Sequence, residues 1–478
     1  MLLHSPAYLV FLFFVVLGSW LLPYGSLRKY WLLGASYIFY SMFNFQFATI
    51  LVGLSIFTYC LGRSLANGEN RRTKIWLGVF INLLVLGYFK YVDFFLDSFS
   101  VFLQSANINH VSPALQILLP VGISFFTFQS ISYFMEINRR KLSAGASLVD
   151  VSLYLAFFPK LIAGPLIRPS NFFFQLAKPV RSLKRRRLAE GISKLLLGFF
   201  KKIVIADGLA SVADVAFQAA TTPNAFGFPS ALYLQGFYLY AIQIYADFSG
   251  YTDIAIGSAH LLGFELPQNF NRPYFATTIT GFWNRWHISL TQWFREYIFF
   301  PISRRLLKAT KRRYPLFVQT MSNLITMTLI GLWHGASWSF VTWGFFHGVL
   351  ISLERMIAFD PKSRWILAMK RLLTFHFVGF GWILFRADSF SSALYYLGSM
   401  FQFQQLNWLS YYLPTILLPG ILLFSIEYLR KERFPRLFEY MEVWQPSVRI
   451  AAMIAILSIL VLNTLRNADP RPFIYGQF

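Results

Sequence analysis

Residues Leu329–Gly348 read LIGLWHGASWSFVTWGFFHG, and apolar residues flank them on both sides. This region predicts two neighbouring spanning helices, Leu316–His334 and Trp338–Ile357, with a turn near Gly335–Ser337 between them. A helix needs about 20 mainly apolar residues to cross a bilayer, and its backbone polar groups must be satisfied internally because lipid offers no water. The pattern therefore predicts an all-helical integral membrane protein.

The composition of the whole chain supports this class. Of its 478 residues, 56% are hydrophobic and 13% are charged, whereas a soluble globular chain carries about 25% charged residues. The 54 Phe, 25 Tyr and 13 Trp residues exclude intrinsic disorder, and a single cysteine, Cys60, excludes a disulfide scaffold. We found no strand alternation, repeat or linker, so we expect one membrane-embedded domain over residues 1–478.

Ten further segments are apolar enough to cross a membrane, which makes about twelve spans in an all-α polytopic bundle. They are Ala7–Leu22, Tyr30–Phe43, Phe47–Leu61, Ile75–Phe95, Leu115–Met135, Gly191–Phe217, Leu232–Leu262, Leu372–Phe385, Thr415–Leu429 and Ile450–Leu465.

The charge distribution predicts the orientation of these spans. The chain has 43 Lys and Arg against 20 Asp and Glu, a net charge of +23, which we attribute to membrane topology and not to nucleic-acid binding, because short basic loops stay on the cytoplasmic side. Three connectors contain no Lys or Arg: Leu96–Ala114, Gln218–Tyr233 and Gln402–Leu413. When these three connectors lie outside and the basic connectors lie on the cytoplasmic side, successive spans cross the membrane in alternating directions throughout. Both termini are then outside. The basic connectors are Arg28–Lys29, Arg63–Lys74, Arg139–Lys141, Lys178–Arg187, Arg304–Arg313, Lys362–Arg371 and Arg430–Arg436.

Two stretches do not resemble ordinary spans. Ala156–Pro169 (AFFPKLIAGPLIRP) contains three prolines and a glycine that interrupt a helix, so it is either a re-entrant element or a loop between interfacial helices. Thr280–Ile302 (TGFWNRWHISLTQWFREYIFFPI) mixes tryptophans with charged residues, which is typical of a helix lying in the membrane interface.

The candidate chemistry centres on His334. The chain has no phosphate-binding loop, no dinucleotide fingerprint and no cysteine pair, and its scattered histidines predict no metal site. An ionisable residue within a membrane is costly and indicates function by default, and a buried neutral histidine is suited to act as a general base. The alternative is a histidine satisfied by a neighbouring carbonyl or hydroxyl group. His287 alone is more simply an interfacial anchor.

Two carboxylates, Asp247 and Asp253, lie in the apolar segment YADFSGYTDIAIG (Tyr245–Gly257). Such groups must face a partner or a cavity inside the membrane. They either line a tunnel or fix helix packing by hydrogen bonds.

Several motifs together resemble the membrane-bound O-acyltransferase family, and more closely its bacterial branch of alginate-type polysaccharide O-acetylases. They include LPVGISFFTFQSISY (Leu119–Tyr133), FFPKLIAGPLIRP (Phe157–Pro169), YADFSGYTDIAIG, NFNRPYFATTITGFWNRWHISLTQWFREYIFFPI (Asn269–Ile302), GLWHGASWSFVTWGFFHG (Gly331–Gly348), WILFRA (Trp382–Ala387) and PFIYGQF (Pro472–Phe478). Two departures are Glu136, where the family has Asp, and Gly476, where relatives often have an aromatic residue.

The resemblance implies that His334 and His287 are the two signature catalytic positions. It also implies a helical bundle around a central tunnel, for which Asn284, Trp333, Asp247 and Asp253 are the lining candidates. The donor would be cytoplasmic acetyl-CoA, with no bound cofactor. The acceptor would lie across the bacterial inner membrane, as a periplasmic acetyltransferase partner or as an exported polysaccharide such as alginate.

Other functions stay open from the sequence alone. Within the same enzyme class, the acceptor could be peptidoglycan or cellulose, or the reaction could be D-alanyl transfer to teichoic acid. Broken helices and buried polar groups also suit a transporter, although such proteins usually show paired halves. A third possibility is a scaffold that anchors an export complex.

Overall fold

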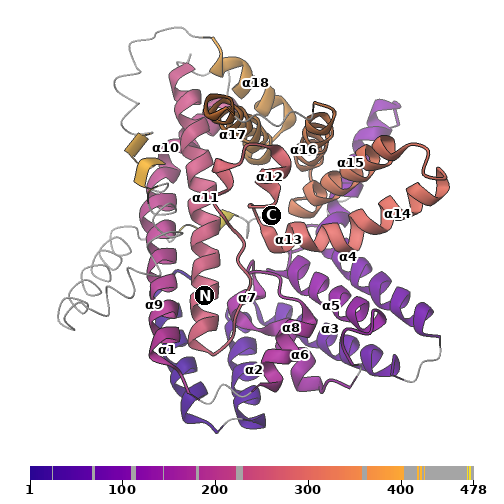
Figure 1. Ribbon diagram of the computed structural model, residues 1–478, viewed down its shortest axis with the longest axis vertical. Coiled ribbons are helices and arrows are strands. Elements are labelled where there is room, and N and C mark those ends of the chain that lie inside the picture. Colours follow the sequence, from indigo (N-terminus) through magenta and orange to yellow (C-terminus); the bar gives the residue numbers. More distant parts are fainter. Residues whose placement is uncertain are drawn as a thin grey trace. The chain divides into compact units, whose positions relative to one another are not determined.

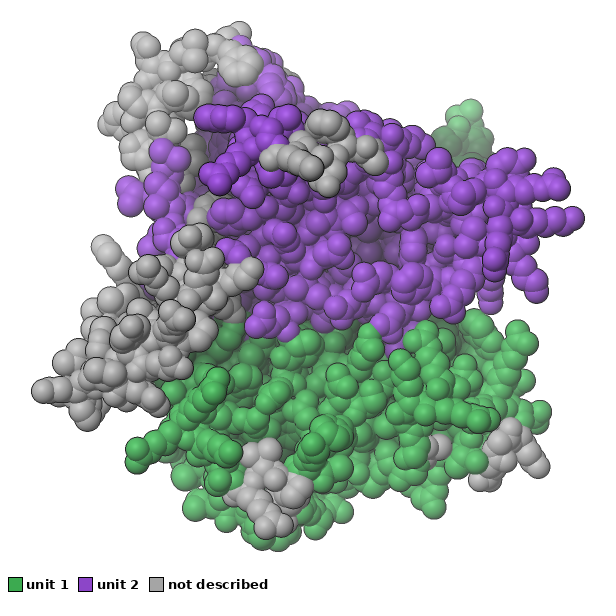
Figure 2. Space-filling model, in the orientation of Figure 1, with its two compact units in different colours: residues 1–195, 253–267 green, residues 196–252, 268–478 purple. Residues whose placement is uncertain are grey.

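The fold was taken from a computed structural model that describes residues 1–23, 25–66, 70–108, 115–143, 145–178, 182–221, 230–357, 363–402, 417–418, 420–422, 425, 471 and 473–474. All regular elements within these ranges are helices, which confirms the predicted all-α class. The chain divides into two compact units, drawn in different colours in Figure 2. Unit 1 comprises residues 1–195 and 253–267, and unit 2 comprises residues 196–252 and 268–478.

Unit 1 holds the first nine helices, labelled in Figure 1. They are α1 (Pro6–Leu21), α2 (Ser26–Ser41), α3 (Phe45–Ser64), α4 (Arg71–Ser105), α5 (Ile123–Asn138), α6 (Leu148–Ala156), α7 (Phe158–Leu161), α8 (Pro169–Ala177) and most of α9 (Arg185–Phe199).

Unit 2 holds the elements that carry both signature histidines. Its α-helices are α10 (Asp207–Thr221), the first part of α11 (Ser230–Leu261), α12 (Ile279–Trp283), α13 (Ile288–Phe294), α14 (Phe300–Ala309), α15 (Pro315–His334), α16 (Trp338–Met356), α17 (Arg364–Arg386) and α18 (Phe390–Met400). Two π-helical segments, Phe200–Ala206 and Arg295–Phe299, and a 3-10 turn, Pro273–Phe275, complete it.

Four helices in the described ranges are long and apolar enough to cross a membrane: α3, α4, α15 and α17. They coincide with four of the twelve predicted spans, and the larger number stays a prediction. The predicted span over 450–465 and most of the one over 415–429 lie outside the described residues. The predicted span Gly191–Phe217 falls within helical structure that runs from Arg185 to Thr221 through a π-helical segment.

The proline-rich stretch in unit 1 is broken, as predicted, and buried. After α6 the chain forms the single turn α7 and then runs irregularly to Pro169, with Arg168 its one exposed side chain. Lys160 is fully buried and donates hydrogen bonds to Gln129 Oε1 and to the carbonyl oxygen of Tyr154. A Cβ added at Gly164 would lie 2.3 Å from the Cα of Lys160, so a larger residue cannot occupy this turn.

The prediction of one interfacial helix over Thr280–Ile302 is wrong. The stretch forms α12, α13, a π-helical segment and the start of α14, and the first break ends at His287. His287 has φ 43° and ψ 52°, a left-handed conformation that a continuous right-handed helix cannot include. Trp283 and Trp286 are buried in unit 2 and not presented at its surface, and the Trp286 ring packs 4.8 Å from that of Trp382. The prediction was made from the mixture of tryptophans and charged residues. Composition does not reveal the left-handed turn at His287 that breaks the helix.

The helices α15 and α16 lie side by side in Figure 1 and pack closely against each other. Two glycines allow this close approach. A Cβ added at Gly331 would lie 2.1 Å from the carbonyl oxygen of Phe340, and one at Gly344 would lie 2.3 Å from that of Met327. Small residues at a membrane helix interface let two backbones come together, which here fixes the end of α15 against the start of α16.

Candidate active site

His334 is the last residue of α15, and 4% of its surface is exposed. Its ring meets the edge or face of three aromatic rings, at centroid distances of 4.8 Å to Trp333, 5.1 Å to Trp343 and 5.3 Å to Phe385. The imidazole is therefore buried among apolar side chains. The three surrounding rings restrict the orientation of the imidazole.

Trp333 connects the two signature histidines. Its ring lies 4.8 Å from His334 and 6.1 Å from His287, so the three side chains form one cluster within unit 2. His287 is fully buried and packs edge-on against Phe248, with a ring-centroid distance of 4.6 Å. Burial lowers the pKa of His287 to about 3, because a low-dielectric environment disfavours the charged imidazolium. The ring is therefore neutral at physiological pH.

A third histidine in the same unit has a packing role. His347 lies on α16, where its Nδ1 accepts a hydrogen bond from Trp283 Nε1 at 3.4 Å. Its ring is 5.1 Å from that of Trp343, which also contacts His334. The hydrogen bond joins α12 to α16 and thus holds the region preceding His287 against the helix that follows His334.

A polar cavity of about 450 Å³ adjoins this cluster in unit 2. Phe385 both lines the cavity and packs against His334, and Phe340 lines it 4.9 Å from Phe385. The volume is in the range of about 300–1,000 Å³ that holds small ligands. The other lining residues are Lys202, Asp207, Asp214, Gln243, Asp247, Ser337, Arg386, Ala387, Asp388, Arg471 and Ile474.

The predicted site residue Asp247 lines this cavity and is paired. Its carboxylate is 2.7 Å from Lys202 Nζ and accepts a hydrogen bond from the Ile474 amide at 2.9 Å. Lys202 also binds Asp207 at 2.8 Å, so one buried ammonium bridges two carboxylates. Sequence reasoning missed Lys202, although two adjacent lysines inside a predicted span were a signal that an intramembrane charge needs a partner.

Replacing Lys202 with Met is expected to destabilise the protein. The substitution keeps an unbranched side chain of nearly the same length but leaves Asp207 and Asp247 without their cation, and breaking a buried ion pair costs about 3–5 kcal/mol. Thermal unfolding in detergent, followed by tryptophan fluorescence, measures the effect. The matched control is Arg186→Met, which removes the cation of an exposed pair with Glu190. Equal melting temperatures for the two variants would contradict the assigned role of Lys202.

The remaining predicted tunnel-lining residues lie elsewhere. Asp253 belongs to unit 1, where it forms a 2.8 Å ion pair with Lys194. Asn284 is an exposed residue of unit 2 at the end of α12 and does not line the described cavity. Of the four candidates, the structure thus places Trp333 and Asp247 at the histidine cluster and its cavity.

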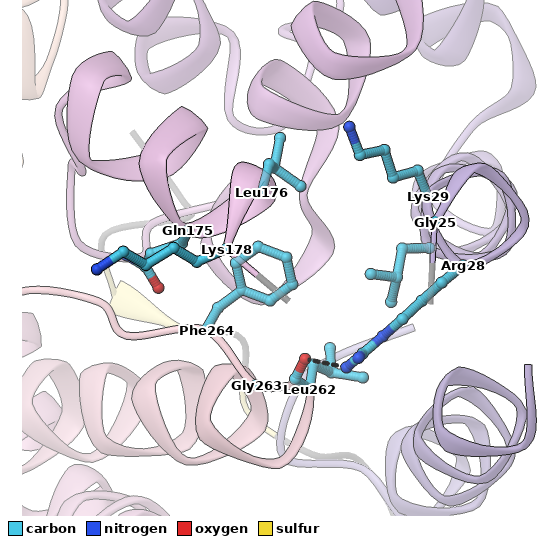
Figure 3. A pocket seen from close by; sticks show the side chains of 10 residues that line it. Gly25, Arg28, Lys29, Gln175, Leu176, Lys178, Leu262, Gly263 and Phe264 are labelled. Carbon is cyan, nitrogen blue, oxygen red and sulfur yellow. Dashed lines mark hydrogen bonds between the residues drawn. The ribbon is translucent and has the colours of Figure 1, made fainter. Parts of the chain in front are cut away.

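A smaller hollow in unit 1 is lined by Arg28, Lys29 and Lys178, but it holds about 30 Å³, room for about one water molecule. Figure 3 shows Arg28 reaching to the carbonyl oxygen of Leu262, a hydrogen bond of 2.9 Å. Arg28 also donates to Ser19 Oγ and lies 4.2 Å above the Trp20 ring. This guanidinium ties α1, α2 and the end of α11 together, so the hollow is a structural junction within unit 1.

Comparison with known proteins assigns the chain to a family. The model of the membrane-bound O-acyltransferase family matches residues 138–397, which include both signature histidines. The chain is 37% identical to a probable alginate O-acetylase of Azotobacter vinelandii, over 84% of this chain and 78% of that protein. It is 35% identical to a peptidoglycan O-acetyltransferase of Helicobacter pylori, over 78% and 73%. It is 28% identical to a teichoic acid D-alanyltransferase of Bacillus subtilis, over 80% and 98%.

The family match and the O-acetylating relatives identify this helical integral membrane protein as an O-acyltransferase. The chain belongs to the membrane-bound O-acyltransferase family. The resemblance inferred from its motifs is confirmed.

Proposed function

We propose that this enzyme moves an acetyl group from cytoplasmic acetyl-CoA across a bacterial inner membrane to a hydroxyl group, for O-acetylation of an exported polysaccharide such as alginate. The observation that carries the proposal is the position of His334, which is buried and packs against Phe385, a residue that lines a polar cavity of about 450 Å³. The similarity to an alginate O-acetylase supports the choice of acetyl group and polysaccharide.

In the proposed reaction, the His334 imidazole takes the proton of the acceptor hydroxyl. The oxygen then attacks the carbonyl carbon of the thioester, an ester bond forms, and the carbon–sulfur bond breaks. The departing CoA thiolate receives the proton that His334 holds. General base catalysis of this kind contributes about 10²–10⁴-fold to the rate. His287, as a neutral ring, supports the thioester end of the reaction.

The predicted topology places the cavity on the acceptor side. Ser337 lies in the predicted outer turn between two spans, and Asp388 lies three residues beyond the predicted outer end of the span Leu372–Phe385. Asp214 lies near the predicted outer end of the span Gly191–Phe217. Three predicted outer ends thus contribute to one cavity, where we place the acceptor, either a periplasmic acetyltransferase partner or the glycan itself.

Peptidoglycan O-acetylation is the second candidate, because a peptidoglycan O-acetyltransferase is nearly as similar to this chain. Purified protein in lipid nanodiscs, supplied with acetyl-CoA labelled in the acetyl group, tests the shared chemistry. We expect release of CoA thiol and transfer of label to a hydroxyl acceptor. Flux of an unmodified substrate without CoA release would support a transporter instead. Cells that lack the gene then show which polymer loses its acetyl groups.

Replacing His287 with Ala is expected to lower acetyl transfer by about 10²-fold, the usual effect of removing one polar group that stabilises the transition state. CoA release from purified protein measures this rate. The control is His376→Ala, which removes a histidine of α17 that bonds Tyr238 outside the cluster. An unchanged rate in His287→Ala would remove this residue from the mechanism.

A further inference from the structure

The break before α13 leaves a capping problem that a distant residue solves. The first backbone N–H groups of a helix have no partner within it, and the side chain of the N-cap residue usually accepts one of them. Here the N-cap residue is His287, and its side chain makes no such bond. The Ser289 amide, near the start of α13, instead donates to Oδ1 of Asn269 at 3.1 Å.

The segment Asn269–Asn271 forms backbone hydrogen bonds on both sides of the turn at His287. The Ile288 amide donates to the carbonyl oxygen of Asn269 at 3.0 Å, and the Asn271 amide donates to the carbonyl oxygen of Arg285, also at 3.0 Å. Together with the Ser289 bond, these contacts hold the residues directly before and after Trp286 and His287. Asn269 is fully buried, so water cannot replace its side chain.

The consequence concerns the ring of His287. A left-handed conformation is unfavourable for a residue with a Cβ and persists where surrounding contacts enforce it. Because Asn269 caps the helix, the imidazole is released from capping and packs between Phe248 and Trp333. Without the cap, the N-terminus of α13 would compete for the ring.

We propose that Asn269 is a positioning residue that caps α13 in place of His287 and so aims the His287 ring at the Trp333–His334 cluster. The proposal rests on the function proposed above for His287. Asn269 does not touch the reacting groups and acts through the turn alone. A misplacement of about 1 Å in a catalytic group lowers rates by about 10²-fold, which sets the expected scale.

The experiment compares Asn269→Ala with Asn269→Asp, which keeps an acceptor oxygen for the Ser289 amide. The matched control is Thr278→Ala, which removes the cap of the neighbouring helix α12, a 2.9 Å bond from the Gly281 amide. We expect CoA release to fall about 10–10²-fold in Asn269→Ala and to recover largely in Asn269→Asp. Thr278→Ala should lower the melting temperature about as much as Asn269→Ala does, but it should retain the parent rate of CoA release.

Two further measurements separate this proposal from the function on which it rests. In a His287→Ala background, adding Asn269→Ala should cause no additional loss, since the residue acts through His287. The ring resonances of ¹⁵N-labelled His287 should shift in Asn269→Ala and stay in place in Thr278→Ala. If these resonances do not move, the positioning role is overturned, whatever the rates. If the resonances move while His287→Ala remains fully active, the proposed catalytic role of His287 fails. In that case Asn269 still positions the His287 ring, but this position does not affect the reaction.

Discussion

The variant His334→Ala is expected to lose acetyl transfer by about 10²–10⁴-fold while the protein still folds. The loss follows from removing the imidazole that would take the acceptor proton. Near-normal folding follows from the surround of His334, since its ring contacts are to Trp333, Trp343 and Phe385, which also pack on other rings. CoA release and acetylation of cell-envelope polymer measure the effect.

His260→Ala serves as the control, because it removes a histidine of unit 1 outside the cluster. Normal acetylation by His334→Ala at normal expression would exclude the general-base role. If CoA were still released but no acceptor became acetylated, His334 would act on the acceptor and not on thioester cleavage. That result would support the assignment of the cavity to the acceptor.

The second large effect is expected for Gly331→Ala. Its Cβ would lie 2.1 Å from the carbonyl oxygen of Phe340 and 3.0 Å from the Cα of Gly344, so backbone and not a flexible side chain must move. Inserting atoms into packed structure costs about 1–3 kcal/mol or more. Because Gly331 lies one turn before His334, the displacement also moves the histidine. We expect a lower melting temperature and a loss of activity larger than the loss of folded protein.

Gly398→Ala is the matched control, since an added Cβ at this helical position of α18 meets no atom within 4 Å. Alanine has a higher helix propensity than glycine, so this variant should be as stable as the parent or slightly more stable. If both substitutions gave the same melting temperature and activity, the α15–α16 contact would not be as tight as its geometry indicates.

Much of the fold was predictable because its causes are local. A run of apolar residues forms a helix in lipid whatever surrounds it, so α3, α4, α15 and α17 coincide with predicted spans. The failure at Thr280–Ile302 has the opposite origin. The left-handed turn at His287 depends on Asn269, eighteen positions earlier in the chain, and no composition or periodicity within the stretch contains that contact.

The amino-acid sequence by itself determined the helical membrane class and the family, because these depend on residue type and order along the chain, and it predicted His334 and His287 as the candidate site residues. Tertiary structure alone decided that Trp333 joins His287 to His334, and that Lys202 neutralises Asp247 beside a cavity. It also separated Asp253 into the other unit and left Asn284 exposed. These outcomes depend on which distant side chains share one space, and that is settled when the helices pack.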